Sequence, residues 1–262
     1  GADGVRMGMM LCAPAGNDIL FDDALCEQGR NFNNKIWNAF RLVKGWNVDA
    51  SIAQPEAARL GCQWFEAMLT KTALEVDDLM SKYRLSEALM AVYRLFWDEF
   101  SSWYLEIVKP AYGCAIDKQT YDATLHYFDA LLRLLHPFMP FITEEIYSGL
   151  PGEEGSIMIK DYPVYNEALV FAADEANMEK VIDAIKAIRT RRAEMGVVPS
   201  RKAKLFIETK YPEAFAGSAS FFEKLASASG MELVDAYDDD TAVRVITSAA
   251  TVHIPLGDLV DF

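Results

Sequence analysis

The chain has 262 residues, of which 52% are hydrophobic and 24% are charged. These proportions are typical of a globular protein with one large or two modest domains. They exclude a disordered chain, a collagen and a disulfide-stapled mini-protein. Acidic residues (39) outnumber basic residues (25), and the net charge of −14 excludes a uniformly basic nucleic-acid coat but not a local basic face.

Most of the first 150 residues have the sequence pattern of helices. Apolar residues recur every three or four positions, which is the spacing of one helix face. The three clearest seams are Leu25, Gly29, Phe32, Ile36, Ala39 and Val43; Leu85, Leu89, Val92, Phe96, Phe100, Trp103 and Ile107; and Tyr121, Leu125, Phe128, Leu132 and Leu135. Several long helices with short connections predict a helical bundle.

Prolines mark the boundaries of three predicted helices. Pro55 can open a helix near 55–80, and Pro110 ends the helix predicted over 84–109, because proline cannot continue the hydrogen-bond ladder. Pro137 marks a break before a shorter helix that runs to residue 150.

The pattern changes after residue 152. Residues 157–172 are mixed in character, and a helix is expected over 174–195. Short strands are predicted at 204–209, 231–236, 242–247 and 251–255, with a helix at 218–227 between them. We therefore expect a mainly α protein, with a helical bundle over 1–155 and a linker and small α+β subdomain over 156–262.

The sequence offers no catalytic or metal-binding constellation. His126, His136 and His253 are scattered, and there is no glycine-rich phosphate loop, no GxSxG motif and no CxxC pair. The adjacent Glu144 and Glu145 point about 100° apart on a helix, which predicts a solvated face, and His136 is interpreted as a packed helix-end histidine. The four cysteines stand far apart, which fits free thiols in a reducing compartment better than a disulfide or zinc framework. Together with the absence of a membrane-length apolar run or a secretory leader, this favours a cytoplasmic location.

One predicted helix, over 29–41, departs from ordinary bundle composition. It holds four asparagines, each of which costs about 0.5–0.7 kcal/mol against alanine in a helix interior. Outside the core seam, two stripes combine guanidinium and ammonium groups, amides and one indole ring. Their members are Arg30, Asn34, Trp37, Arg41 and Lys44, and Asn31, Lys35 and Asn38. Phosphates bind such cations, and unstacked bases bind amides and rings, so this face is a candidate nucleic-acid surface.

A structural interpretation of the same helix stays open. The asparagines could bond to neighbouring helices and Trp37 could belong to the bundle core. Both interpretations hold together if Asn31 and Asn38 are structural while Arg30, Lys35 and Arg41 are exposed.

A second basic run occupies 178–204, where eight basic residues face three acidic ones. Arg189 flanks the apolar stripe of the predicted helix, and Arg192 falls on that stripe, so its charge needs a partner or an open helix end. Gly196 is a predicted C-cap. A solvated helix face and a phosphate-binding role are both consistent with this run.

The same stretches resemble the bacterial valyl-tRNA synthetase family. The motifs that carry the resemblance are GADGVR at 1–6, PAGNDILFD at 14–22, GRNFNNKIWNAFR at 29–41, HPFMPFITEEIY at 136–147 and RTRRAEMGVVP at 189–199. The motif at 136–147 is shared more widely among class Ia synthetases. In the family, the HIGH and KMSKS signatures, the nucleotide-binding fold and the editing insertion lie upstream of such a segment. At the other end, LGDLVD at 256–261 resembles the stretch before the family's coiled-coil arm. We therefore expect this chain to be a piece of a longer enzyme.

The resemblance implies a function that the residue pattern alone does not give. In the family, the bundle receives the anticodon stem-loop, and the positions that match its motif are Arg30, Asn31, Asn34, Lys35, Asn38 and Arg41, with Arg189 and Arg192 as weaker candidates. The implied partner is the valine tRNA, and the parent enzyme would use ATP and magnesium to join valine to it. This chain would hold no cofactor, would neither activate valine nor edit, and would act as a monomer without binding DNA or a membrane.

Two alternative functions of a different kind stay open, a protein–protein scaffold and a complete small enzyme. The chain could instead be a helical protein–protein scaffold that docks a partner helix on the asparagine-rich face of the helix predicted over 29–41, which suits the acidic total charge. A complete small enzyme is disfavoured by the absent constellation.

Overall fold

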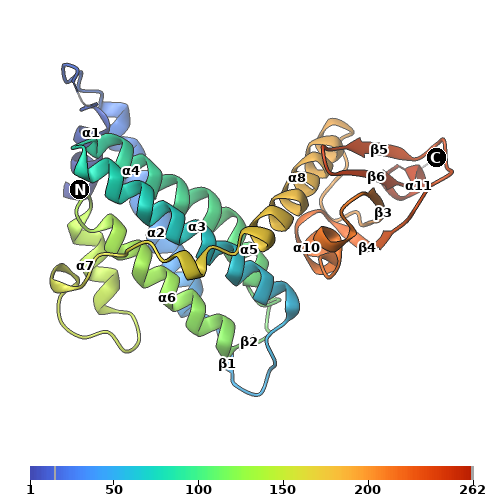
Figure 1. Ribbon diagram of the computed structural model, residues 1–262, viewed down its shortest axis with the longest axis horizontal. Helices are drawn as coiled ribbons and strands as arrows, with labels where there is room; N and C mark the ends of the chain where they lie inside the picture. Colours follow the sequence, from blue (N-terminus) through green and yellow to red (C-terminus); the bar gives the residue numbers. More distant parts are fainter. Residues whose placement is uncertain (15, 261–262) are drawn as a thin grey trace. The chain divides into compact units, whose positions relative to one another are not determined.

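The computed structural model describes residues 1–14 and 16–260 (Figure 1). Ala15, within the motif at 14–22, lies outside the described residues, as does Asp261 at the end of the motif at 256–261. Close contacts group the chain into two units, one of Gly1–Gln54, Phe65–Leu105 and Lys109–Val170, and one of Pro55–Trp64, Glu106–Val108 and Phe171–Phe262. The domain boundary expected between 155 and 156 stays a prediction.

The first unit is helical. Its elements are α1 (Ala2–Leu11), α2 (Asp23–Lys44), β1 (Val48–Asp49), most of α3 (Glu56–Ser81), α4 (Leu85–Arg94), the π-helix η1 (Leu95–Tyr104), β2 (Ile116–Asp117), α6 (Lys118–Leu135), α7 (Pro140–Ser148) and the 3-10 turns η2 (Ile157–Ile159) and η3 (Glu167–Leu169). The bundle expected from the helix-face spacings is confirmed.

Fully buried aromatic rings fill the centre of this helical unit. The Phe100 ring lies 5.6 Å from that of Phe128 and 5.3 Å from that of Phe65, which in turn lies 5.1 Å from Tyr127. All four side chains are at most 2% exposed. Such tilted and edge-to-face pairs add stability beyond the apolar area they bury.

Glycines allow α1 and α2 to approach closely. A Cβ atom on Gly29 would lie 2.7 Å from the carbonyl oxygen of Gly4, and one on Gly8 would lie 2.6 Å from Sγ of Cys26. Both distances are below any ordinary contact, so glycine is required where the two backbones meet. This explains why Gly29 occupies a position on the core seam of α2.

The second unit contains a mixed four-stranded sheet. Its elements are α5 (Leu105–Val108), α8 (Ala172–Glu194), β3 (Ala203–Thr209), α9 (Pro212–Phe215), α10 (Ala219–Leu225), β4 (Ala228–Leu233), β5 (Val243–Ile246), β6 (Ala250–Ile254) and α11 (Leu256–Leu259). The strand order is β4-β3-β6-β5, with β3 parallel to β4 and antiparallel to β6 (Figure 1). Along β3, Ala203, Leu205 and Ile207 are buried and Lys204 is exposed.

Two predictions of secondary structure need correction, and two short strands were not predicted. The helix expected over 84–109 is confirmed as a continuous helical stretch, but its middle is the π-helix η1, within which the rings of Phe100 and Tyr104 are stacked. The strand expected at 231–236 begins at Ala228, because its parallel pairing with β3 starts there. The two-residue strands β1 and β2 were too short for a periodic signal.

Among the residues that the structure describes, no helix combines the length and the apolar character that a membrane crossing needs.

Candidate nucleic-acid interface

The core seam of α2 fixes which of its side chains face outward. The carboxylate of Asp22 caps the first turn by accepting the amide of Ala24 at 2.9 Å, and Gly45 follows the last turn. The buried positions are Gly29, Phe32, Ile36, Ala39, Phe40 and Val43. Because successive residues turn by about 100°, residues on the opposite arc must point away from the bundle.

Five predicted tRNA-binding residues lie on that opposite arc, which we call the outer strip: Arg30, Asn31, Asn34, Asn38 and Arg41. All five are exposed. Within residues 1–14 and 16–260, none of their side chains forms a hydrogen bond or ion pair. The structural interpretation of Asn31 and Asn38 is therefore wrong, and the indole of Trp37 is 39% exposed rather than in the core.

Lys35 lies at the edge of the outer strip and contacts an aromatic ring. Its ammonium lies 5.2 Å from the centre of the Trp97 ring, which suits a cation–π contact. Trp97 packs in turn against Tyr93 at 5.5 Å and Phe32 at 6.3 Å. The sequence pattern did not single out Trp97, because the pair joins residues on two different helices.

The electrostatic character of the outer strip differs from that of the chain as a whole. It contains two guanidinium groups and three amides and no carboxylate, and Lys35 and Lys44 flank it. Glu27 is the one acidic residue between positions 27 and 46. A locally basic surface therefore interrupts an acidic protein, which is the field that a phosphate backbone follows.

The two candidate residues on α8 are engaged within their own unit. Arg189 donates from Nε to the carbonyl of Leu225 at 2.6 Å. Arg192 is only 6% exposed, and its Nη2 donates to the carbonyls of Val198 at 3.0 Å and Arg201 at 2.5 Å. Burial lowers the pKa of Arg192. Its position on the apolar stripe required partners, and the loop after α8 provides them.

The motifs at 1–6 and 136–147 hold each other in place. The buried carboxylate of Asp3 accepts the amides of Phe141 and Ile142, at 3.3 Å and 2.7 Å. Arg6 donates to the carbonyls of Phe138 and Pro137 at 3.1 Å and 3.0 Å. These contacts satisfy backbone groups at the ends of α6 and α7, so both motifs have a structural role in the bundle.

Two further residues of the motif at 136–147 have structural partners. Nδ1 of His136 lies 2.8 Å from the hydroxyl of Thr143 at the end of α6, where a packed helix-end histidine was predicted. Glu144 accepts the hydroxyl of Ser156 and the amide of Ile157, both at 3.0 Å. The predicted solvated face is therefore wrong for Glu144, whereas Glu145 is exposed.

Across the described ranges, no group of three or more histidine, cysteine, aspartate or glutamate side chains is placed to hold a metal ion.

Comparison with known proteins gives a family match. Residues 62–207 match the family described as the anticodon-binding domain of tRNA ligase. The chain is 55% identical over 263 aligned residues to a valine–tRNA ligase from Parabacteroides distasonis. It is 56% identical over 266 residues to a valine–tRNA ligase from Phocaeicola vulgatus. All of this chain is covered in both comparisons, and it spans 29% of the length of each relative.

Among solved structures, the chain is similar to the LeuRS of Agrobacterium radiobacter K84 in a ternary complex with tRNA and LeuAMS. The identity is 20%, the TM-score is 0.47, and the match covers 65% of this chain and 20% of the other.

Proposed function

The chain belongs to the family of anticodon-binding domains of tRNA ligases, and we propose that the outer strip of α2 binds the anticodon stem-loop of a valine tRNA. The observation that carries this proposal is that the side chains of the outer strip are exposed and unpaired. The strip contains cationic and amide groups but no carboxylate, and within the described ranges these side chains form no hydrogen bond or ion pair.

The chemistry of each side chain suggests which part of the RNA it would contact. The guanidinium groups of Arg30 and Arg41 bind phosphates through paired donors, and Lys35 adds a third cation. The amides of Asn31, Asn34 and Asn38 both donate and accept, so they can read the edges of unpaired bases. The half-exposed ring of Trp37 offers a surface on which a base can stack. Arg189 and Arg192 are weaker candidates for contacts with the RNA, because their guanidinium groups already donate to carbonyls of their own unit.

We propose further that the chain works as part of a valine–tRNA ligase, as its relatives at 55–56% identity are named. The whole protein would join valine to its tRNA with ATP and magnesium in the cytoplasm, as a monomer. The residues described here would position the tRNA and would take part in neither valine activation nor editing.

The test is fluorescence anisotropy of labelled anticodon stem-loops, one with the valine anticodon and one non-cognate. We expect the chain to bind the valine stem-loop more tightly. We also expect the double variant Asn34→Ala/Asn38→Ala to lose about tenfold in affinity for the valine stem-loop and most of its preference, because each lost base contact leaves a polar edge unpaired.

Asn47→Ala is the matched control, since Asn47 is an exposed asparagine of the same unit outside the outer strip. Equal binding of both stem-loops by the unmodified chain would reject base reading by the outer strip. Salt-resistant binding of a protein partner at the same face, independent of RNA, would favour the scaffold reading instead.

A further inference from the structure

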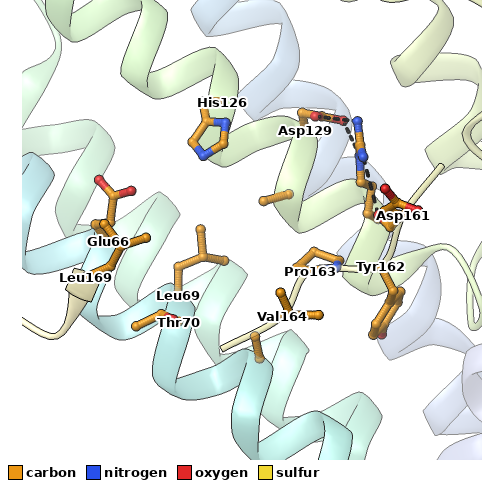
Figure 2. Close-up of a pocket in the computed structure, with 13 residues that line it drawn as sticks. Glu66, Leu69, Thr70, His126, Asp129, Asp161, Tyr162, Pro163, Val164 and Leu169 are labelled. Atoms are coloured by element: carbon orange, nitrogen blue, oxygen red, sulfur yellow. Dashed lines mark hydrogen bonds and ion pairs between the residues drawn. The ribbon is translucent and has the colours of Figure 1, made fainter. Parts of the chain in front are cut away.

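A pocket of about 430 Å³ lies in the helical unit, away from the outer strip. Its walls come from α3, α6 and the segment 161–169 (Figure 2). This volume is within the range of sites that bind small molecules. None of the residues that line it lies on α2, so the proposed binding of RNA leaves it unexplained.

The wall formed by the segment 161–169 is tied to both neighbouring helices. The amide of Asn166 donates to the hydroxyl of Thr70 on α3 at 2.7 Å. The hydroxyl of Tyr162 donates to the carbonyl of Leu134 on α6 at 2.8 Å, and Nη1 of Arg133 donates to the carbonyl of Asp161 at 3.3 Å. These hydrogen bonds fix the wall in position, which lowers the ordering cost of binding.

The rim of the pocket carries an excess of negative charge. Three of its side chains are carboxylates: Glu66, Asp129 and Asp161. Arg133 is the one basic residue besides His126, and its guanidinium is bonded to both oxygens of Asp129 at 3.0 Å. Burial raises the pKa of Asp129 despite that pair, so its negative charge is incompletely solvated. A cation would be attracted to this rim.

Glu66 is the carboxylate best placed to receive a ligand. It is half-buried, and its Oε2 accepts the hydroxyl of the buried Tyr127 at 2.9 Å, which holds the carboxylate in position. Figure 2 shows Glu66 and Asp129 on different sides of the view, with His126 between them and Leu69 below. Unlike Asp129, Glu66 forms no ion pair with any described residue.

Small apolar side chains line the space between these charged groups. Ala73 on α3 and Ala130 on α6 are buried, and their short side chains leave room that a larger residue would fill. Leu69 adds apolar surface, and Val164, which is 80% exposed, forms part of the outer edge. The pocket thus combines an anionic rim with an apolar interior.

We propose that this pocket binds a small amphipathic cation, a primary alkylammonium with a short alkyl chain. The ammonium lies against the Glu66 carboxylate, and the alkyl chain covers Leu69, Ala73 and Ala130. An anion of the same length meets the carboxylates unfavourably, and a neutral alcohol leaves Glu66 without a counter-charge.

The proposal is tested by isothermal titration of the 262-residue chain with n-hexylammonium, n-hexanol and hexanoate in phosphate buffer. We expect saturable binding of n-hexylammonium, weaker binding of n-hexanol and none of hexanoate. Glu66→Gln should weaken n-hexylammonium binding about tenfold, because it keeps the shape of the side chain but removes its charge.

Glu75→Gln is the matched control, because Glu75 is an exposed glutamate of α3 outside the pocket. The affinity of this variant for n-hexylammonium should be unchanged. The absence of saturable binding, equal affinity for n-hexanol, or an equal loss in Glu75→Gln would overturn the proposal. If Glu66→Gln does not fold, Ala130→Leu decides: filling the pocket should abolish binding, and retained binding would place the ligand elsewhere.

Discussion

The carboxylate of Asp3 accepts the amide of Ile142 at 2.7 Å, although 139 residues separate the two in sequence. Asp3 is 5% exposed, and its other oxygen accepts the amide of Phe141. Asp3 thereby satisfies donors in the first turn of α7 from a different helix, in place of a side-chain cap at Met139, which forms none. The contact locks the beginning of the chain onto the helix that follows Pro137.

Asp3→Ala should lower the free energy of unfolding by about 1–3 kcal/mol, because two partly buried amides lose a charged acceptor. Asp3→Asn should cost less, since the amide oxygen can still accept one of them. Urea denaturation followed by circular dichroism measures both changes. Asp18→Ala, at an exposed aspartate, serves as the control, and an equally large loss there would show that the effect is not specific to the α7 contact.

Gly29→Ala should destabilise the helical unit by about 1–3 kcal/mol, because its Cβ would lie 2.7 Å from the Gly4 carbonyl oxygen and force α1 away from α2. Thermal unfolding monitors the change. Gly257→Ala in α11, where a Cβ would meet no atom within 4 Å, should be neutral or slightly stabilising. A neutral Gly29→Ala would contradict the close approach of the two helices.

The half-buried Asp129 predicts a pH dependence of stability. Burial raises its pKa in the folded state above the usual value near 3.9, so the folded chain holds this proton at pH values where the unfolded chain has lost it. Stability therefore falls as the pH rises from about 4 through the raised pKa. Asp129→Asn cannot ionise and should lack this component.

The measurement is the difference in unfolding free energy between the unmodified chain and Asp129→Asn from pH 3.5 upward. Other titrating groups cancel in that difference. If the unmodified chain instead became more stable relative to Asp129→Asn as the pH rises, the ion pair with Arg133, and not burial, would determine the pKa of Asp129.

Arg192→Gln distinguishes a structural role from contact with RNA. The guanidinium bonds the carbonyls of Val198 and Arg201 within a buried setting, so its loss should lower the unfolding free energy by about 1–3 kcal/mol. Binding of the valine stem-loop should change little by comparison. Weaker RNA binding without any loss of stability would assign Arg192 to the RNA surface instead.

Helix-face spacing was sufficient to predict the outer strip, because the buried seam of α2 fixes the rotation of the helix and hence the direction of Arg30, Asn34 and Arg41. Local sequence also located α8 to within two residues at each end, since a helix was expected over 174–195 and α8 is Ala172–Glu194. For these elements, one amphipathic face determines the structure.

The remaining features depend on contacts between residues far apart in sequence. Lys35 meets Trp97, Asp3 meets Ile142, and the pocket wall at 161–169 is anchored to Thr70. No periodic pattern records such pairings, because each is decided by how helices pack. The same applies to Glu144, whose partners lie in the loop after α7.

The salt dependence of binding to the valine anticodon stem-loop tests the central claim most directly. If Arg30, Lys35 and Arg41 neutralise three phosphates, log K should fall with log salt at a slope of about −2, and Arg30→Ala/Lys35→Ala should reduce it to about −0.7. Lys82→Ala/Lys118→Ala, which removes two exposed, ion-paired lysines elsewhere in the unit, should leave the slope unchanged. An unchanged slope in Arg30→Ala/Lys35→Ala would contradict the assignment of the outer strip as the RNA-binding surface.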